Sequence, residues 1–245
     1  RNQKTKEVLR MRTINTLVLV FTVALITMPV ISNGANLDVG IQAGFCMTQG
    51  NYDFDLYDSQ SKYGPGFYGG LTTTLVLPNL KKFGFETGVF LWQRGGETDF
   101  EMNSTDQFGD ILWERTDTYD WRLSYLTIPI SARYSFSEDG EGFYLKAGGE
   151  IAFLLKAELE YPDYDMFSQV EPDAEIKEKD VKDDFKNYDI SAIGGFGYSF
   201  PLEKMKGFIE LSFIFGFMDV LDPSDVVLNA KIRNRSFGVS GGIHF

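Results

Sequence analysis

Six ionisable side chains interrupt segments that are otherwise apolar at alternate positions: Glu86, Arg94, Arg133, Lys146, Glu150 and Glu210. In GFYLKAGGEIAFLLKAELEY, residues 142–161, every charged residue lies at an even position, and the odd positions are apolar, aromatic or glycine. Unpaired charges in a narrow protein interior cost several kcal/mol each, so charges that share one face are expected to pair. We therefore predict a structural network of ion pairs, in preference to an ion or proton pathway.

A single histidine, His244, is the one obvious candidate for a general base. Hydrolases that activate a serine need a histidine within hydrogen-bond reach of the nucleophile. This residue lies on the polar face of the last apolar segment, RSFGVSGGIHF, residues 235–245. We interpret it as a polar interior side chain, and we predict no catalytic residues.

Acidic clusters suggest a second kind of chemistry, the binding of calcium by carboxylate oxygens. The candidate ligands form two groups: Asp53, Asp55 and Asp58, and Asp180, Asp183 and Asp184. Neither group has the spacing of an EF-hand loop. The sequence therefore favours solvated acidic loops, and we predict no metal and no cofactor.

The overall charge narrows the range of partners. The chain has 245 residues and a formal net charge of −12. Binding to nucleic acid relies on clustered lysine and arginine, so this composition argues against a nucleic-acid partner. The only cysteine is Cys46, which rules out a disulfide within the chain and fits a small side chain in the first strand.

Residues 1–35 differ in composition from the rest. Arg10 and Arg12 precede the apolar run 14–31, which is followed by small residues up to Ala35. This order is typical of a cleavable signal peptide, and residues 1–10 would be an extension upstream of a start at Met11. The alternative is a transmembrane anchor, because the apolar run approaches the length that spans a bilayer.

The remainder, residues 36–245, reads as a series of strands. Alternation with a period of two recurs in eight segments: 37–48, 67–77, 83–94, 126–136, 142–161, 188–200, 208–217 and 235–245. Short connections alternate with long polar ones at 49–63, 97–120, 162–187 and 218–232. An even number of strands with short and long connections in turn is typical of an antiparallel, up-and-down transmembrane β-barrel. We predict an all-β, eight-stranded barrel of this kind.

Aromatic residues indicate that the apolar face meets lipid. One group lies at the short-turn ends of the apolar faces: Phe83, Phe85, Tyr134, Phe136, Phe143, Tyr198, Phe200 and Phe245. Another lies near the long-loop ends: Tyr125, Tyr161, Tyr188 and Phe217. Two bands of rings at the rims of an apolar surface are the interface girdles of a membrane barrel. The alternative is a soluble, lipocalin-like barrel with the apolar face inside.

Two stretches carry a resemblance to a known family. YLTIPISARYSF (125–136), the tight turn after it and GFYLKAGGEIAFLLKAE (142–158) resemble the outer-membrane β-barrel domain family that includes PorT-like proteins. The resemblance implies the outer membrane of a Gram-negative bacterium of the Bacteroidota type. The last segment, ending on Phe245, is similar to the terminal strand that the barrel assembly machinery recognises.

The functional expectation follows from this resemblance and from the acidic loops. Most such barrels have no assigned activity, and one branch is linked to protein secretion and gliding. We expect a non-enzymatic scaffold or binding protein whose outer loops meet an unidentified protein or glycan. Its other partners would be outer-membrane lipid and lipopolysaccharide. A narrow channel and a lipid-modifying enzyme are the alternatives.

Overall fold

Long strands account for most of the chain. The computed structural model describes residues 36–53, 59–77, 79–105, 111–163, 175–221 and 231–245, so the predicted signal peptide lies outside the described residues. Eight strands are long: β1 (Asn36–Asp53), β3 (Gly64–Leu77), β4 (Leu80–Thr105), β5 (Ile111–Ser135), β6 (Gly142–Asp163), β8 (Tyr188–Leu202), β9 (Met205–Gly216) and β10 (Lys231–His244). The short elements are β2 (Ser59–Lys62), β7 (Glu175–Asp180) and the 3-10 turn η1 (Lys182–Asp184). In the part of the chain described, no helix has the length and apolar character needed to cross a membrane.

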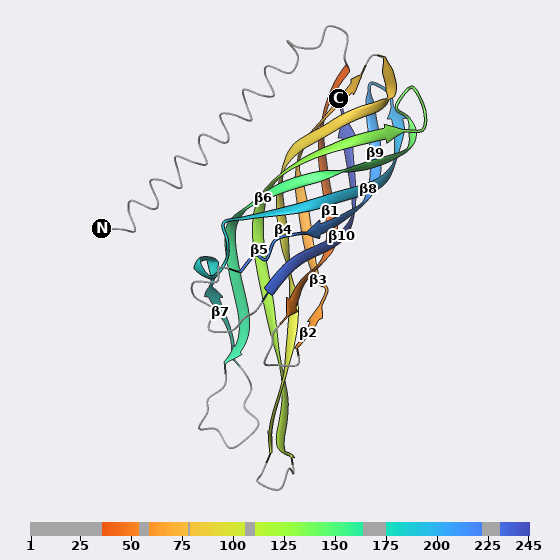
Figure 1. Cartoon of the computed structure of the whole chain (residues 1–245). Coiled ribbons are helices and arrows are strands. Elements are labelled where there is room, and N and C mark those ends of the chain that lie inside the picture. The colour runs from red at the N-terminus through yellow and green to blue at the C-terminus, as the bar shows by residue number, and fades with distance from the viewer. Residues whose placement is uncertain (1–35, 54–58, 78, 106–110, 164–174, 222–230) are drawn as a thin grey trace, which may run out of the picture.

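The eight long strands close into a barrel. Each pairs antiparallel with the next long strand along the chain, and β10 returns to pair with β1 over a register running from Gly40↔His244 to Asp53↔Lys231. The strands are tilted, and the C-terminus lies at the end where the tight turns are (Figure 1). A closed barrel satisfies its backbone hydrogen bonds without leaving an edge in lipid. The predicted eight-stranded, up-and-down barrel is confirmed.

The two faces of the barrel carry opposite kinds of side chain. Outward positions are apolar and exposed, as at Phe45 (77%), Phe67 (61%) and Leu91 (60%). The intervening inward positions are polar and buried: Gln42, Thr72, Thr74, Glu86, Ser131, Ser199, Glu210, Ser212 and Ser240. The apolar residues therefore face the membrane and the polar residues fill the lumen, as in outer-membrane barrels.

The region predicted as a long connection at 97–120 is largely strand. β4 and β5, of 26 and 25 residues, stay paired as far as Thr105↔Ile111 and form a hairpin that extends well beyond the rest of the barrel (Figure 1). Gly95, with a φ of 148°, lies where this hairpin leaves the barrel. A Cβ atom there would come within 1.7 Å of the Trp121 carbonyl oxygen, so only glycine fits. The composition of this region is polar, as in a loop, so it did not indicate that the strands continue.

A β-bulge in β6 changes which residues face inward. Ser124 pairs with Lys156 but Tyr125 pairs with Leu154, so Leu155 is the extra residue. Beyond the bulge the inward face passes to the odd positions, and Ala157 is fully buried. The prediction that the odd positions face lipid through the whole of 142–161 is therefore wrong beyond Leu155. An inserted residue reverses the alternation of a strand, and nothing in the local composition marks it.

Segments from the long loops close the lumen at the hairpin end of the barrel. A cluster of buried apolar side chains joins the inner walls of β5, β6 and β10 to the residues on either side of η1 and to those after β9: Leu123, Tyr125, Ala152, Leu154, Ala157, Val181, Phe185, Val220, Leu221 and Ile232. Backbone contacts hold the loops together, with Lys186 N donating to Val220 O and Val220 N donating to Ile232 O. We call this cluster the cap.

Candidate functional site

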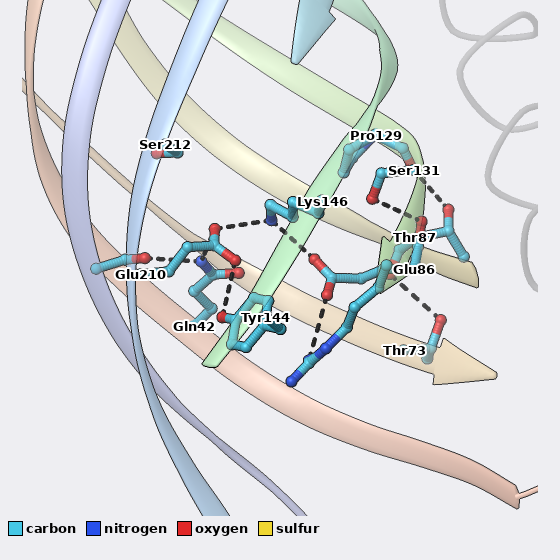
Figure 2. A network of polar contacts seen from close by, with 12 residues as sticks. Gln42, Thr73, Glu86, Thr87, Pro129, Ser131, Tyr144, Lys146, Glu210 and Ser212 are labelled. Atoms are coloured by element: carbon cyan, nitrogen blue, oxygen red, sulfur yellow. Dashed lines mark hydrogen bonds and ion pairs between the residues drawn. The ribbon is translucent and has the colours of Figure 1, made fainter. Parts of the chain in front are cut away.

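The charged layer of the lumen that lies nearer the short turns is centred on Lys146, and we call it the Lys146 layer. Its ammonium group lies between two carboxylates from opposite walls, 2.8 Å from Glu86 Oε1 and 2.7 Å from Glu210 Oε1 (Figure 2). Arg133 makes the third ion pair of the layer, with its Nη1 3.7 Å from Glu86 Oε2. The side chains of these four residues are at most 9% exposed. Two cations and two carboxylates thus balance among largely buried side chains.

Hydrogen bonds use much of the donor and acceptor capacity that the ion pairs of this layer leave free. Tyr144 Oη donates to Glu210 Oε2 at 3.0 Å, and Gln42 Nε2 donates to Glu210 Oε1 at 3.3 Å and to Ser240 Oγ at 2.8 Å. The Arg133 guanidinium lies 3.6 Å from the centre of the Tyr144 ring. Such contacts are what make a buried ion pair tolerable.

A second charged pair lies nearer the hairpin end. Arg94 Nη2 donates to Glu150 Oε1, and both side chains are almost completely buried. The guanidinium carbon of Arg94 is 4.9 Å from the Trp92 ring and 5.5 Å from the Tyr125 ring. Aromatic faces stabilise a desolvated cation, because their quadrupole presents negative charge.

Aromatic and apolar residues fill the lumen beside the two charged groups. Tyr68 stacks on Trp92 with ring centroids 3.9 Å apart, in a cluster with Cys46, Phe90 and Ile214. The cavity that remains among these side chains measures about 30 Å³, room for about one or two water molecules. Together with the cap, this packing leaves the middle of the lumen filled.

The six predicted lumen charges therefore separate into two groups. Glu86, Arg133, Lys146 and Glu210 come together in the Lys146 layer, and the ion pair that Arg94 forms within the described residues is with Glu150. The aromatic partners of these charges were not predicted. Tyr144 and Trp92 occupy the same alternate positions as the charged residues, and that spacing was the available signal.

The aromatic residues predicted at the short-turn rim mostly lie together on the outer surface. Phe83 packs against Tyr134 with centroids 4.9 Å apart, and Phe143 packs against Tyr198 at 5.0 Å. Phe85, Phe136 and Phe245 are also exposed on the outside. Tyr125 is a correction: it is 1% exposed and belongs to the cap.

Tyr161 lies beyond the apolar belt, in a row of rings at the base of the hairpin. It stacks on Tyr119, with centroids 6.5 Å apart, and Tyr119 meets Phe100 edge-on at 5.1 Å. These three residues come from β6, β5 and β4, and we call them the aromatic row. The β-bulge accounts for the position of Tyr161, since it shifts the outer part of β6 by one residue.

Ion pairs lie on the opposite face of the same strands, at positions that alternate with those of the aromatic row. Arg122 lies 3.2 Å from Asp120 Oδ2 and 2.6 Å from Glu160 Oε1. The hydrogen bond from Lys62 lowers the pKa of Asp99, and the same contact raises the pKa of Lys62. These exposed pairs contribute little to stability and chiefly fix the orientation of the side chains.

The candidate calcium ligands are described only in part, and the described ones form no metal site. Asp53, Asp55 and Asp58 lie outside the residues whose side chains the structure describes. Asp180 accepts a hydrogen bond from Lys182 N at 3.0 Å, within its own turn. Across the described side chains, no three potential metal ligands gather at one point.

Comparison with known proteins places this geometry in a family. Residues 29–222 match the profile of a family described as outer membrane protein beta-barrel domain. This chain belongs to that family. As an outer-membrane β-barrel protein it lies in the outer membrane, where its apolar face meets lipid. No curated protein sequence matches this outer-membrane barrel.

Several solved outer-membrane proteins share the barrel at low identity. Ail of Yersinia pestis, in complex with the heparin analogue sucrose octasulfate, is 12% identical, with a TM-score of 0.39 over 86% of this chain and 99% of Ail. OprG of Pseudomonas aeruginosa is 12% identical, with a TM-score of 0.42 over 85% of this chain and 95% of OprG. The protease OmpT of Escherichia coli is 11% identical, with a TM-score of 0.35 over 88% of this chain and 97% of OmpT.

Proposed function

We propose that this outer-membrane barrel is a non-enzymatic anchor that presents the β4–β5 hairpin to a protein or glycan outside the cell. The observation that carries the proposal is the pairing of β4 with β5 as far as Thr105↔Ile111. Longer loops face the cell exterior in barrels of this class, so the hairpin points outward.

The length of the hairpin exceeds what the membrane requires. A tilted strand crosses the bilayer in about 9–11 residues, and 26 residues of β4 extend over roughly 85 Å. More than half of the strand is thus available outside the membrane. A paired hairpin of this length is a more rigid display surface than a loop, because its backbone hydrogen bonds are already made.

The aromatic row supports a binding role. Phe100, Tyr119 and Tyr161 lie side by side at the base of the hairpin, and Arg122 with its carboxylate partners lies on the opposite face of the same strands. Aromatic residues are enriched in binding interfaces. The acidic excess of the chain favours a neutral or basic ligand surface over an acidic one.

The filled lumen supports an anchor over a channel. Ions would have to pass the Lys146 layer, the Arg94–Glu150 pair and the cap, each of which is packed by buried side chains. The lipid-modifying enzyme has less support still. His244 Nε2 has no hydrogen-bond partner among the described residues, and His244 lies at the short-turn end, opposite the outer leaflet where lipid substrates would be reached.

The finer assignments rest on resemblance. PorT-like character, with a role in envelope assembly or secretion, is the implication of residues 125–158, and it would make the ligand a protein of the cell's own envelope. Phe245, which is 64% exposed at the end of the closing strand, is our candidate contact for the barrel assembly machinery. Arg233 and Arg235, exposed on β10 close to Phe237, are the candidate contacts for lipopolysaccharide phosphates.

Shortening the hairpin tests the proposed function. In one variant, Asn-Gly replaces residues 97–120, joining the paired residues Gly96 and Trp121 by a two-residue turn. A photo-crosslinker at Tyr119 of the full-length protein first captures the partner and identifies it. We expect the shortened variant to insert normally, read as heat-modifiable gel mobility, and to lose binding of that purified partner.

A matched pair of substitutions refines the test. Phe100→Ser with Tyr119→Ser should weaken binding of the captured partner at least about 30-fold, the effect of removing an interface hot spot. Phe143→Ser with Tyr198→Ser, in the short-turn girdle, should leave binding unchanged. Equal binding by all variants would contradict the proposal.

A further inference from the structure

A cavity of about 430 Å³ opens at the short-turn end of the barrel, opposite the hairpin. Short turns face the periplasm in barrels of this class, so this cavity is open to periplasmic solutes. Its inner end lies against the Lys146 layer, because Arg133, which contacts Glu86, also lines the cavity. The cavity is therefore a blind vestibule. Its volume is that of a small-molecule pocket.

Two buried polar atoms in the wall of the vestibule have no hydrogen-bond partner among the described residues. They are His244 Nε2 and Thr74 Oγ1, on side chains that are 4% and 3% exposed. The His244 ring is fixed by stacking on Phe208, with centroids 4.8 Å apart. Buried polar groups are almost always hydrogen-bonded, so two of them in the wall of one cavity indicate a partner that the cavity admits.

Donor groups outnumber free acceptors in the vestibule. Four cations line it: Lys81, Lys82, Arg133 and Lys206. Of its three carboxylates, Asp139 already accepts hydrogen bonds from Ser137 Oγ and Glu141 N, and Asp38 lies 3.8 Å from Lys206. Of the three, Glu138 makes no hydrogen bond or ion pair with the described residues, and neither Lys81 nor Lys82 makes an ion pair with any of them.

Arg133 is held in place at the inner wall. Its Nη2 donates to Ser199 Oγ at 3.1 Å, and its guanidinium lies over the Tyr144 ring. A guanidinium has five N–H donors, and these two contacts with the Glu86 pair leave part of that capacity unused. A pre-oriented guanidinium is well suited to bind an oxyanion.

We propose that the vestibule is a binding site for an oxyanion, the carboxylate or phosphate group of a small periplasmic solute or of a lipid headgroup. Arg133, His244 Nε2 and Thr74 Oγ1 would contact the anion inside, and Lys81 and Lys82 would attract it at the rim. The site is separate from the hairpin and is independent of the proposed binding role.

The single histidine provides a direct readout. We would label the histidine with ¹⁵N and ¹³C in tag-free protein refolded in a phosphate-free neutral detergent, and titrate inorganic phosphate and, separately, acetate. The expected result is a saturable shift of the one imidazole signal. Lys81→Gln with Lys82→Gln should weaken the apparent affinity about fivefold, since exposed cation contacts are modest. Lys156→Gln with Lys179→Gln makes the same charge change at the hairpin end of the barrel and should leave the apparent affinity for the anion unaltered.

The source of the oxyanion is decided by repeating the titration in phosphatidylglycerol nanodiscs. A signal that already lies at its bound position, and that added phosphate does not move, assigns the site to a lipid headgroup. An unchanged titration assigns it to a soluble anion. The proposal is overturned by the absence of a saturable shift, by an equal shift with sodium chloride at matched ionic strength, or by equal effects of the two double variants.

Discussion

At the scale of single residues, the lumen shows how charges are tolerated inside a membrane protein. Arg94 forms its ion pair with Glu150 and lies beside the rings of Trp92 and Tyr125, and Asp189 is a second carboxylate close enough to interact with its charge. The guanidinium still has two nitrogen atoms, Nε and Nη1, without a partner among the described residues. It therefore depends strongly on Glu150.

Removal of the Glu150 charge should be strongly destabilising. Glu150→Gln leaves Arg94 charged and unpaired, so we expect the free energy of unfolding to fall by about 3–5 kcal/mol. Replacing both residues by methionine should recover most of the loss, since no buried charge remains. Urea unfolding in lipid vesicles, followed by tryptophan fluorescence, measures the free energy of unfolding of both variants. A small effect of Glu150→Gln would show that Arg94 has another counter-ion.

Sequence alternation could identify which charges enter the lumen, but not which of them pair. Glu86 and Glu210 lie far apart in sequence and meet only because the closed barrel brings both strands around Lys146. Pairing depends on strand tilt and stagger, which the pattern of a single strand does not contain. The aromatic partners, such as Tyr144, share the same alternation and could have been anticipated.

At the scale of elements, β6 and its partners show where pattern reasoning fails. The bulge at Leu155 moves Ala157 into the cap and brings Tyr161 beside Tyr119. Alternation predicted the strand in the membrane well, since one face had to be apolar there. Outside the membrane that constraint disappears, and polar composition did not separate a loop from the extended β4–β5 hairpin.

The β6–β7 pairing should depend on pH. Glu158 raises the pKa of Glu178 through a carboxyl–carboxylate contact, so the folded pairing binds this proton more tightly than the unfolded segment does. The added stability is therefore present below the usual glutamate pKa and is lost as pH rises through the raised value. Glu178→Gln should slow amide hydrogen exchange in β7 at pH 7 and leave it unchanged near pH 3.

A control at the other end of the molecule separates this effect from net charge. Glu203→Gln, in the turn between β8 and β9, makes the same charge change and should not alter exchange in β7. If Glu178→Gln left exchange at pH 7 unchanged, the repulsion between the two carboxyl groups would be negligible.

At the scale of the whole molecule, the barrel has three functional levels along its axis. The hairpin and the aromatic row extend outward, the charged layers and the cap fill the middle, and the vestibule opens to the periplasm. Apolar side chains cover the outside of the middle level and of the vestibule wall, as at Phe85 and Phe245. We propose that the two ends bind ligands and that the middle serves as the anchor.

The cap alone does not account for closure. Phe185→Ser with Leu221→Ser removes two apolar side chains from the cap, at two residues that a backbone β-bridge joins. We expect this variant to remain impermeable, because the Lys146 layer and the Arg94–Glu150 pair are unchanged. Swelling of proteoliposomes in small sugars measures permeability. Rapid swelling would locate the barrier in the cap.

The central claim, that the lumen is filled and the barrel serves as an anchor, is tested most directly by single-channel recording. Refolded, tag-free wild-type protein would be inserted into planar bilayers in 1 M potassium chloride, with insertion verified by gel mobility. The account predicts no steady conductance steps at any applied voltage that the bilayer withstands. Reproducible, ohmic steps from the wild-type protein would contradict it and would favour the channel.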